Sequence, residues 1–196
     1  MKILLAFMTT AVILSLIVII KLFLKIKFLY GKIKYVDEAN MWHKLAVMDD
    51  LTSVYNRTAY NMHVERKAQK EPRAIMLFDV DDFKTINDRE GHLAGDAILK
   101  EAAKILCDVF YESEYTVFRI GGDEFSVISE GVSEKEIIER LIDLKKRLER
   151  NGKISLSKGY SLVYDSFEKA FDDADRMLYA DKLSKDLHIS SLSKNS

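Results

Sequence analysis

The sequence predicts an α+β domain with a central mixed, mainly antiparallel sheet flanked by helices and preceded by one transmembrane helix. Three observations support this prediction. The chain opens with a long uncharged stretch, apolar runs typical of strands then alternate with segments of helical periodicity, and a Gly-Gly pair separates two apolar arms typical of a β-hairpin. A chain of 196 residues can hold one domain of ordinary size plus a short additional element.

The uncharged stretch covers residues 3–20. A helix of this length reaches about 27 Å at about 1.5 Å per residue, close to the ~30 Å hydrocarbon core of a bilayer. A cleavable signal peptide is the alternative, but its apolar region would be shorter and would end in a small-x-small site, whereas KLFLKIKF follows here. We therefore predict an uncleaved transmembrane helix over residues 1–24.

Lysines dominate the residues that follow this span. Five lysines occur between residues 21 and 34 before any acidic residue, against Lys2 alone ahead of the span. By the positive-inside rule, this asymmetry predicts a single-pass protein of the inner or cytoplasmic membrane. Everything from Lys21 onward is then expected in the cytoplasm.

Residues 25–48 form the predicted juxtamembrane helical linker. Residues at seven-residue spacing occur here in two sets: Leu22, Leu29 and Val36, and Ile26, Ile33, Asn40 and Val47. Such a seam is typical of a parallel coiled coil with one polar core position. Gly31 and His43 interrupt it, so a single helix with chance periodicity is equally compatible, and the sequence leaves both alternatives open.

The composition bears on partners and on redox chemistry. A formal net charge of −1 provides no overall basic field, so we predict no nucleic-acid partner. Cys107 is the single cysteine, which excludes an intrachain disulfide. Its place in an apolar helical pattern predicts a buried thiol rather than a reactive one.

The domain is expected over residues 49–190, with residues 191–196 as a disordered tail. Its elements follow the order β-α-β-β-α-β-α after a first helix. Helices are expected at 57–70, 93–113, 134–150 and 167–183, and strands at 74–78, 116–120, 125–129 and 154–163.

Carboxylates gather in two of the predicted turns. The strand 74–78 leads directly into Asp79, and the hairpin turn carries Asp123 and Glu124. An acid that emerges from a buried strand is costly unless a cation neutralises it. If the hairpin pairs beside this strand, Asp123 comes close to Asp79, and oxygen donors of this kind favour Mg²⁺ over zinc.

Five motifs resemble the GGDEF family of diguanylate cyclases, in family order and at compatible spacing. They are GGDEF at 121–125, DDLTSVYNR at 49–57, FDVDDFKTIND at 78–88, EGHLAGD at 90–96 and ADRMLYADK at 174–182. The resemblance implies the cyclase palm, with a five-stranded sheet flanked by helices. It also implies condensation of two GTP molecules into cyclic di-GMP and pyrophosphate across a homodimer.

The resemblance also implies a metal site and a catalytic base. Asp79, the backbone carbonyl of Val80 and Asp123 would ligate Mg²⁺, with Mn²⁺ as a substitute. Asp123 would also take the proton of the attacking 3′-hydroxyl, supported by Glu124, although Glu124 can instead serve only to cap the turn.

The remaining matched residues would bind the nucleotide. Lys84 and the backbone of Phe83 would contact the triphosphate, as would Lys182, although a lysine late in a helix also compensates the helix dipole. Asn87 and Asp96 suit the hydrogen-bonding edge of guanine. His92 matches a further nucleotide contact or else packs the loop. Arg119 is expected to have a structural role.

Several positions depart from the family pattern. The family's product-inhibition motif RxxD is replaced by residues 112–115 (ESEY), so that site is expected to be absent. Asp186 stands where an arginine is usual, Lys185 where a glycine is usual, and Lys158 where an apolar residue is usual. These departures motivate an alternative, a catalytically weak module that binds GTP as a regulatory or scaffold domain. No recognisable sensor domain fits between the predicted membrane span and the domain, so any input is expected through the anchor helix, a membrane sensor partner or the expression level.

Overall fold

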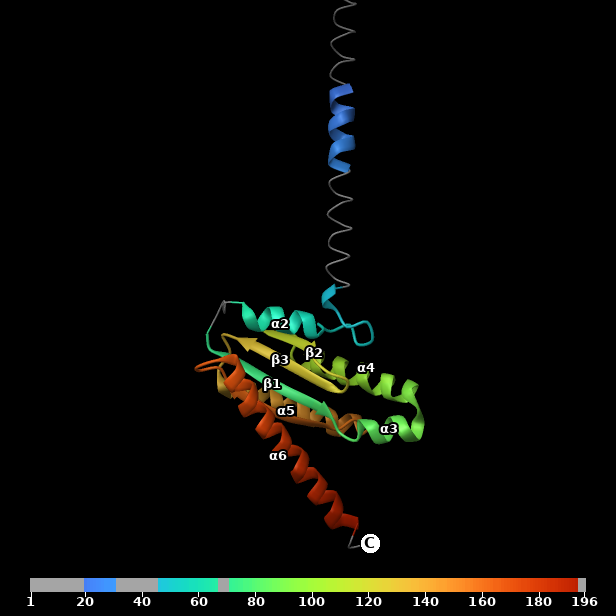
Figure 1. The fold of residues 1–196 in the computed structure, drawn as a ribbon, viewed down its shortest axis with the longest axis vertical. Coiled ribbons are helices and arrows are strands. Elements are labelled where there is room, and N and C mark those ends of the chain that lie inside the picture. Colours follow the sequence, from blue (N-terminus) through green and yellow to red (C-terminus); the bar gives the residue numbers. More distant parts are fainter. Residues whose placement is uncertain (1–19, 31–45, 67–70, 194–196) are drawn as a thin grey trace, which may run out of the picture. The chain divides into compact units, whose positions relative to one another are not determined.

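Four strands form one antiparallel sheet in the computed structural model, which describes residues 20–30, 46–66 and 71–193. The strands lie in the order β2-β3-β1-β4, so the first strand of the chain is central (Figure 1). They are β1 (Arg73–Val80), β2 (Tyr115–Arg119), β3 (Glu124–Glu130) and β4 (Leu156–Leu162). The helices are α2 (Arg57–Glu65), α3 (Phe83–Glu90), α4 (His92–Val109), α5 (Glu134–Asn151) and α6 (Phe167–Ser193).

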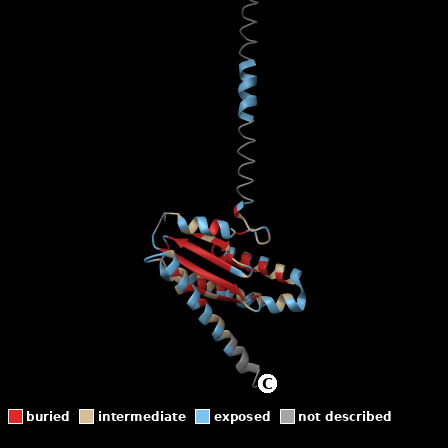
Figure 2. Ribbon diagram, in the orientation of Figure 1, coloured by how far each residue is buried: buried red, intermediate tan, exposed pale blue. Residues whose placement is uncertain are grey.

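Helices cover both faces of this sheet. Alternate residues of β1 contribute to two separate hydrophobic clusters, Met76 and Phe78 to one and Ile75 and Leu77 to the other. Residues of α4 and α5 complete the first cluster, and residues of α2 and α6 complete the second. All of β1 is therefore buried, and Figure 2 shows the strands as a buried layer between helices.

Local sequence explains where several of these elements begin and end. Ser133 and Glu136 form a capping box that starts α5, and Gly152 ends it in the left-handed conformation at φ 65°. Asn56 starts α2 by accepting a hydrogen bond from the Ala59 N–H at 3.1 Å. The predicted strands and the hairpin are confirmed, with ends shifted by a few residues.

The predicted fifth strand is wrong for the described residues. Only residues 163–166 separate β4 from α6, which leaves no room for another strand after β4. Of the residues before α2 that the structure describes, Met48 and Tyr55 pair through isolated bridges, Met48 with Tyr55 and Tyr55 with Phe118. The bridge between Tyr55 and Phe118 is parallel, while the neighbouring strands of the sheet all run antiparallel.

Three helix predictions also need correction. The first helix ends at Glu65 rather than at residue 70, with Arg66 in an extended conformation, and α4 ends at Val109 rather than at 113. Helix α6 continues past residue 183 to Ser193. Cys107 is exposed because it lies on the outer face of α4, while Ala103 and Leu106 on the inner face are buried.

The part of the chain before the domain is a separate unit. Contacts divide the chain into Met1–Ala46 and Val47–Ser196, and residues 20–30 of the first unit are helical. Among the helices of the described residues, none combines the length and apolar character needed to cross a membrane. Most of the predicted span 1–24, and most of the predicted linker 25–48, lie outside the described residues.

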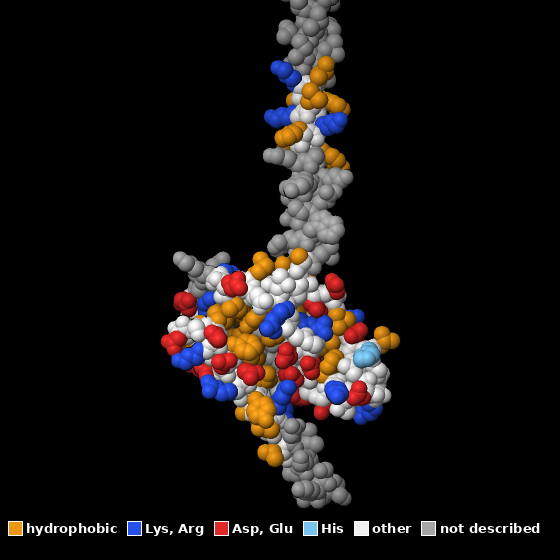
Figure 3. Space-filling view, in the orientation of Figure 1, with side chains coloured by type: hydrophobic (Ala, Val, Ile, Leu, Met, Phe, Trp, Pro, Cys, Tyr) orange, Lys and Arg blue, Asp and Glu red, His pale blue; other side chains and the backbone are white. Residues whose placement is uncertain are grey.

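Charged side chains of both signs are interspersed over the domain surface that Figure 3 shows. This pattern agrees with the small formal net charge of −1. It provides no single-signed patch on that face of the kind that attracts polyanions.

Candidate active site

The carboxylates expected to hold a metal lie at one edge of the sheet. Strand β1 pairs with β3 so that Asp79 stands opposite Glu124, and the Val80 N–H donates to the Asp123 carbonyl oxygen at 3.2 Å. The prediction that the hairpin pairs beside β1 is therefore confirmed. Asp79 is buried, with 8% of its surface exposed, and Asp123 is half-buried at the turn.

Lys182 of α6 reaches this edge and forms an ion pair with Asp79, with Nζ 2.8 Å from Oδ2. Burial raises the pKa of Asp79 above its ordinary value, since the Lys182 contact offsets only part of that effect and the charges of Asp123 and Asp81 add to it. Burial alone would lower the pKa of Lys182, but its hydrogen bond to Asp79 raises it. The charged form of Asp79 is thus unfavourable at this buried edge, and the ammonium group of Lys182 neutralises it.

Arg119 holds the tip of the hairpin in place. Its Nε and NH2 groups donate to the Gly122 carbonyl oxygen at 3.1 and 2.7 Å, and its NH1 donates to Asp49 Oδ1 at 3.0 Å. The structural role expected for Arg119 is confirmed. The Glu124 side chain lies over Gly121, where an added Cβ would be 2.2 Å from Glu124 Oε2, so a larger residue at this position would displace the Glu124 carboxylate.

The segment DDLTSVYNR, which leads into α2 and ends at its first residue, supports the same turn, a role that was not predicted from the sequence. The Asp49 carboxylate accepts hydrogen bonds from the Thr52 N–H at 2.9 Å and the Thr52 hydroxyl at 2.6 Å, which orient it toward Arg119. Arg57 NH1 donates to the Ile120 carbonyl oxygen at 3.0 Å. Arg57 is separated from Ile120 by 63 positions in the chain, so only the folded structure reveals this support.

The predicted nucleotide-binding residues lie on the neighbouring helices α3 and α4. An added Cβ at Gly95 would be 2.0 Å from Asn87 Oδ1, so the Asn87 side chain lies against α4 one residue before Asp96. The structure thus brings the two residues predicted to read guanine close together. Phe83 packs against the hydrophobic core, whereas Lys84 is exposed near the start of α3 and His92 is exposed at the start of α4.

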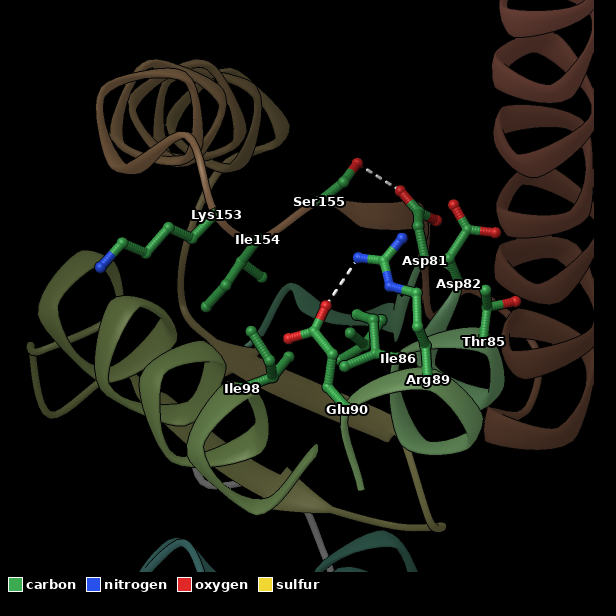
Figure 4. A pocket seen from close by; sticks show the side chains of 11 residues that line it. Asp81, Asp82, Thr85, Ile86, Arg89, Glu90, Ile98, Lys153, Ile154 and Ser155 are labelled. Carbon is green, nitrogen blue, oxygen red and sulfur yellow. Dashed lines mark hydrogen bonds and ion pairs between the residues drawn. The ribbon is translucent and has the colours of Figure 1, made fainter. Parts of the chain in front are cut away.

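A cleft of about 630 Å³ lies on a different face of α3. Ile86, Arg89 and Glu90 line it from α3, Ile98 from α4, and residues 153–155 from the loop before β4 (Figure 4). Val80 is the one predicted site residue among its lining residues. Helical spacing places Lys84 and Asn87 on the other face of α3, so the cleft and the predicted nucleotide contacts are separate features.

The loop between β1 and α3 is fixed by Asp81, which sequence analysis did not identify as a site residue. Its carboxylate accepts hydrogen bonds from Ser155, from Ser157 at 2.5 Å, and from Lys185 Nζ at 2.8 Å. Burial alone would raise the pKa of Asp81, but these hydrogen bonds hold it below its ordinary value. Lys185 therefore has a defined partner, whereas the side chain of Asp186 lies outside the described ones.

The positions that replace the RxxD motif form a compact cluster of their own. Glu112 forms an ion pair with Arg140, with 2.5 Å between Oε2 and NH2. The Arg140 guanidinium also lies 5.3 Å from the ring centre of Tyr111 and 5.8 Å from that of Tyr115. Burial alone would lower the pKa of Arg140, but the Glu112 hydrogen bond raises it, so Arg140 stays charged and tied to residues of this segment.

The donor set at the sheet edge suits a hard divalent cation. Within the residues that the structure describes, no three His, Cys, Asp or Glu side chains are grouped to hold a metal ion. The edge instead offers the Asp79 and Asp123 carboxylates together with the carbonyl of Val80. Such a set of oxygens fits Mg²⁺, which commonly takes one or two carboxylates and fills its other positions with water or substrate phosphate.

Comparisons with known proteins agree with this arrangement. Residues 46–187 match the family described as "Diguanylate cyclase, GGDEF domain". An uncharacterized membrane protein of Staphylococcus aureus is 30% identical over 181 residues, covering 79% of this chain and 50% of that protein. The chain thus spans about half the length of the curated relatives it matches.

Solved structures of similar fold include two that contain cyclic di-GMP. The coiled coil and GGDEF domain of DgcB from Caulobacter crescentus, in complex with c-di-GMP, has a TM-score of 0.71 at 22% identity, covering 79% of this chain and 90% of that one. A microbial GGDEF domain described with bis-(3′,5′)-cyclic di-GMP has a TM-score of 0.62 at 29% identity, covering 71% and 94%.

The fold and the match across residues 46–187 define an α+β domain of the GGDEF type. The chain belongs to the GGDEF domain family, whose members are diguanylate cyclases or related domains that bind cyclic di-GMP. The resemblance that the five motifs indicated is confirmed.

Proposed function

We propose that this protein is an active diguanylate cyclase that condenses two GTP molecules into cyclic di-GMP and pyrophosphate. One observation carries the proposal: β1 and β3 place the buried Asp79 next to the turn that bears Asp123. A nucleotidyl transfer needs a cation to offset the charge that gathers at phosphorus, and the costly Asp79 carboxylate is a suitable ligand for one. Mg²⁺ would be bound by Asp79, Asp123 and the Val80 carbonyl, with Mn²⁺ as a substitute.

Asp123 and Glu124 would have different roles in the reaction. Asp123 accepts the proton of the 3′-hydroxyl of one GTP. The 3′-oxygen attacks the α-phosphate of the second GTP, and pyrophosphate leaves from that phosphate. Glu124 supports the turn beside Asp123. The bound Mg²⁺ would supply charge neutralisation at the phosphate and activation of the hydroxyl.

Two lysines would contact the triphosphate. Lys84 is exposed at the start of α3, close to the backbone N–H groups of the first turn, which are suited to phosphate oxygens. Lys182 neutralises Asp79 in the structure described here. With Asp79 serving as a metal ligand, Lys182 would be available to contact the phosphates.

Guanine recognition falls to Asn87 and Asp96, with His92 as a further contact. An aspartate accepts from both donors on the N1 and N2 edge of guanine, and an asparagine side chain can donate and accept. Adenine lacks that pair of donors. The contact of Asn87 with α4 next to Asp96 supports this assignment.

The reaction joins two nucleotides, so the active form would be a homodimer in which each protomer carries one GTP. The protein would be anchored by residues 1–24 in the cell membrane, with the domain in the cytoplasm. The uncharged stretch supports the anchor, as does the description of the S. aureus relatives as membrane proteins. Input would then come through the anchor or a membrane sensor partner.

The first test removes the proposed base. Purified full-length protein is incubated with GTP and Mg²⁺, and cyclic di-GMP is measured by nucleotide chromatography. We expect Asp123→Asn to lower turnover by a factor of about 10³ or more, because the amide neither ligates the cation as strongly nor takes the proton. The far-ultraviolet circular dichroism spectrum should not change. Retained turnover would exclude Asp123 from the mechanism.

A scaffold function is the second candidate, favoured by the ion pair between Lys182 and Asp79. This pair competes with metal binding, so a protein in which it persists would bind GTP without turnover. Measurable GTP binding without any cyclic di-GMP at high protein concentration would support the scaffold and reject the cyclase.

A further inference from the structure

The carboxylate of Asp81 binds two segments that are far from it in the chain, the start of β4 and helix α6. It accepts hydrogen bonds from Ser155, which precedes β4, from Ser157 within β4, and from Lys185 of α6. The backbone N–H of Asp81 also donates to the Ser155 carbonyl oxygen at 3.0 Å. Figure 4 shows Asp81 and Ser155 pointing toward each other at the rim of the cleft.

Lys185 completes this network from the side of α6. Its Nζ donates to the Leu156 carbonyl oxygen at 2.8 Å and to the Ser157 hydroxyl at 3.2 Å, in addition to its bond with Asp81. Asp181, one turn earlier on α6, lies 3.6 Å away and adds a second negative charge. The ammonium group is thus fixed by oxygens on several sides.

Two parallel ion pairs result. Lys182 and Lys185 lie one turn apart on α6, and they pair with Asp79 and Asp81, which lie two residues apart at the end of β1. Between the two acids, the Val80 N–H is bonded to the Asp123 carbonyl oxygen. Movement at Asp81 therefore affects Val80 and Asp79 directly.

The loop needs such a restraint because its next residue is strained. Asp82 adopts φ 56°, in the left-handed region that is unfavourable for most non-glycine residues. The side chain of Asp82 makes no capping hydrogen bond to α3. The bonds of Asp81 therefore restrain the loop next to a residue in this less favourable conformation.

We propose that Asp81 and Lys185 are positioning residues for the nucleotide site, which hold Asp79, Val80 and Lys182 in register before metal and GTP bind. This inference rests on the proposed function. Glycine is the usual residue of the family pattern at position 185, so the resemblance does not predict this contact.

The test compares Lys185→Met with Lys158→Met, each in the full-length protein. Lys158 shares Asp181 with Lys185, at 3.9 Å between Nζ and Oδ2, but it is not among the hydrogen-bond partners of Asp81, so its replacement is a matched control for loss of one lysine. Without any nucleotide, we expect hydrogen exchange at the Asp81 amide to become about tenfold faster in Lys185→Met. The exchange rate should stay within about twofold in Lys158→Met and in the charge-conserving Lys185→Arg.

The second readout is equilibrium binding of GTP with Mg²⁺. We expect Lys185→Met and Asp81→Asn each to weaken GTP binding about tenfold. In these variants, binding must also order the residues that contact the metal ion and the phosphates, and this ordering reduces the net free energy of binding. Their double variant should weaken GTP binding by no more than either single variant, since both changes remove the same contact. Thermal unfolding of each variant checks that the fold is retained, and Ser157→Ala replaces any variant that does not fold.

The results separate this inference from the proposed cyclase activity. Unchanged exchange at the Asp81 amide in Lys185→Met overturns the inference, whether or not the protein makes cyclic di-GMP. Faster exchange with unchanged GTP binding also overturns it, because the contact would then stabilise the loop without serving the site. Faster exchange together with weaker binding supports it, even for a protein that binds GTP without turnover.

Discussion

His63 is a histidine enclosed by charged and aromatic side chains on the face of the sheet that α2 covers. Its Nε2 lies 2.8 Å from Arg66 NH2, and its ring packs edge-on against Phe118 with 5.3 Å between ring centres. Burial lowers the pKa of His63 to about 4, and the charge of Arg66 acts in the same direction, against a smaller opposing effect of Glu130. The folded protein therefore favours the neutral ring, whereas the unfolded chain binds the proton with an ordinary pKa.

This difference predicts a stability loss on acidification. The contribution of His63 is fully present above about pH 6.5 and is lost as the pH falls toward 4, because the unfolded chain then binds a proton that the folded protein does not. Between pH 7.5 and pH 5 we expect His63 to reduce the free energy of unfolding by about 2 kcal/mol. Urea unfolding at both pH values should show this reduction in the natural protein and its absence in His63→Gln. Equal pH dependence of the two would contradict the assigned pKa.

Single residues differ in how far the sequence predicts their roles. The pairing of Asp79 with the turn of Asp123 was predictable, because a carboxylate that ends a buried strand and a carboxylate in a hairpin turn can meet only in a few ways. The contact between Lys185 and Asp81 was not, since the two residues are 104 positions apart and join through the length of α6. Cys107 was predicted on the buried face of its helix but lies on the exposed face. Successive residues of a helix differ by about 100° in direction, so a small error in placing the apolar face moves a side chain from buried to exposed.

The packing of α6 on β4 depends on one glycine. A Cβ added at Gly159 would lie 2.0 Å from the Ala174 carbonyl oxygen and 2.5 Å from the Leu178 backbone nitrogen. These atoms belong to the backbone of α6, so they cannot move aside as a flexible side chain would. The close approach places Lys182 and Lys185 over the end of β1.

We expect Gly159→Ala to push α6 away from the sheet. Overpacking of this kind costs about 1–3 kcal/mol of unfolding free energy. GTP binding should weaken as well, because α6 carries Lys182. Urea unfolding and GTP titration provide the measurements, with Ser161→Ala as the control, since its hydroxyl donates only to the neighbouring Leu162 carbonyl at 3.2 Å. A Gly159→Ala variant as stable as the natural protein would exclude this tight contact.

At the level of elements, strong periodicity predicted well and resemblance alone predicted less well. Helix α5 was predicted correctly because its apolar residues recur at helical spacing. The hairpin of β2 and β3 was predicted correctly because two apolar runs flank a Gly-Gly turn. The fifth strand was predicted only from the resemblance to the GGDEF family. The short connection at 163–166 leaves no room for it. Helix α6 was predicted too short because its last turns lack an apolar period, with Leu187 72% exposed.

For the whole molecule, the proposed reaction requires two protomers, and mixing tests this requirement. Natural protein is combined with a tenfold excess of Asp123→Asn protein and left until the subunits exchange. If two intact protomers are needed for each product, random pairing lowers the activity per natural protomer about tenfold. The rate of cyclic di-GMP formation gives the result, and an equal excess of bovine serum albumin is the control. Unchanged activity would mean that a single protomer completes the reaction.

The edge of β4 has a further consequence for the protein as a whole. As the last strand of the sheet, β4 leaves backbone groups without a neighbouring strand, and such an edge can recruit strands from other molecules. The N–H of Lys158 is occupied by the Asp181 carboxylate at 3.0 Å, which also places a negative charge there. Asp181 of α6 thereby satisfies one backbone donor of this edge and makes it less available to a strand from another molecule.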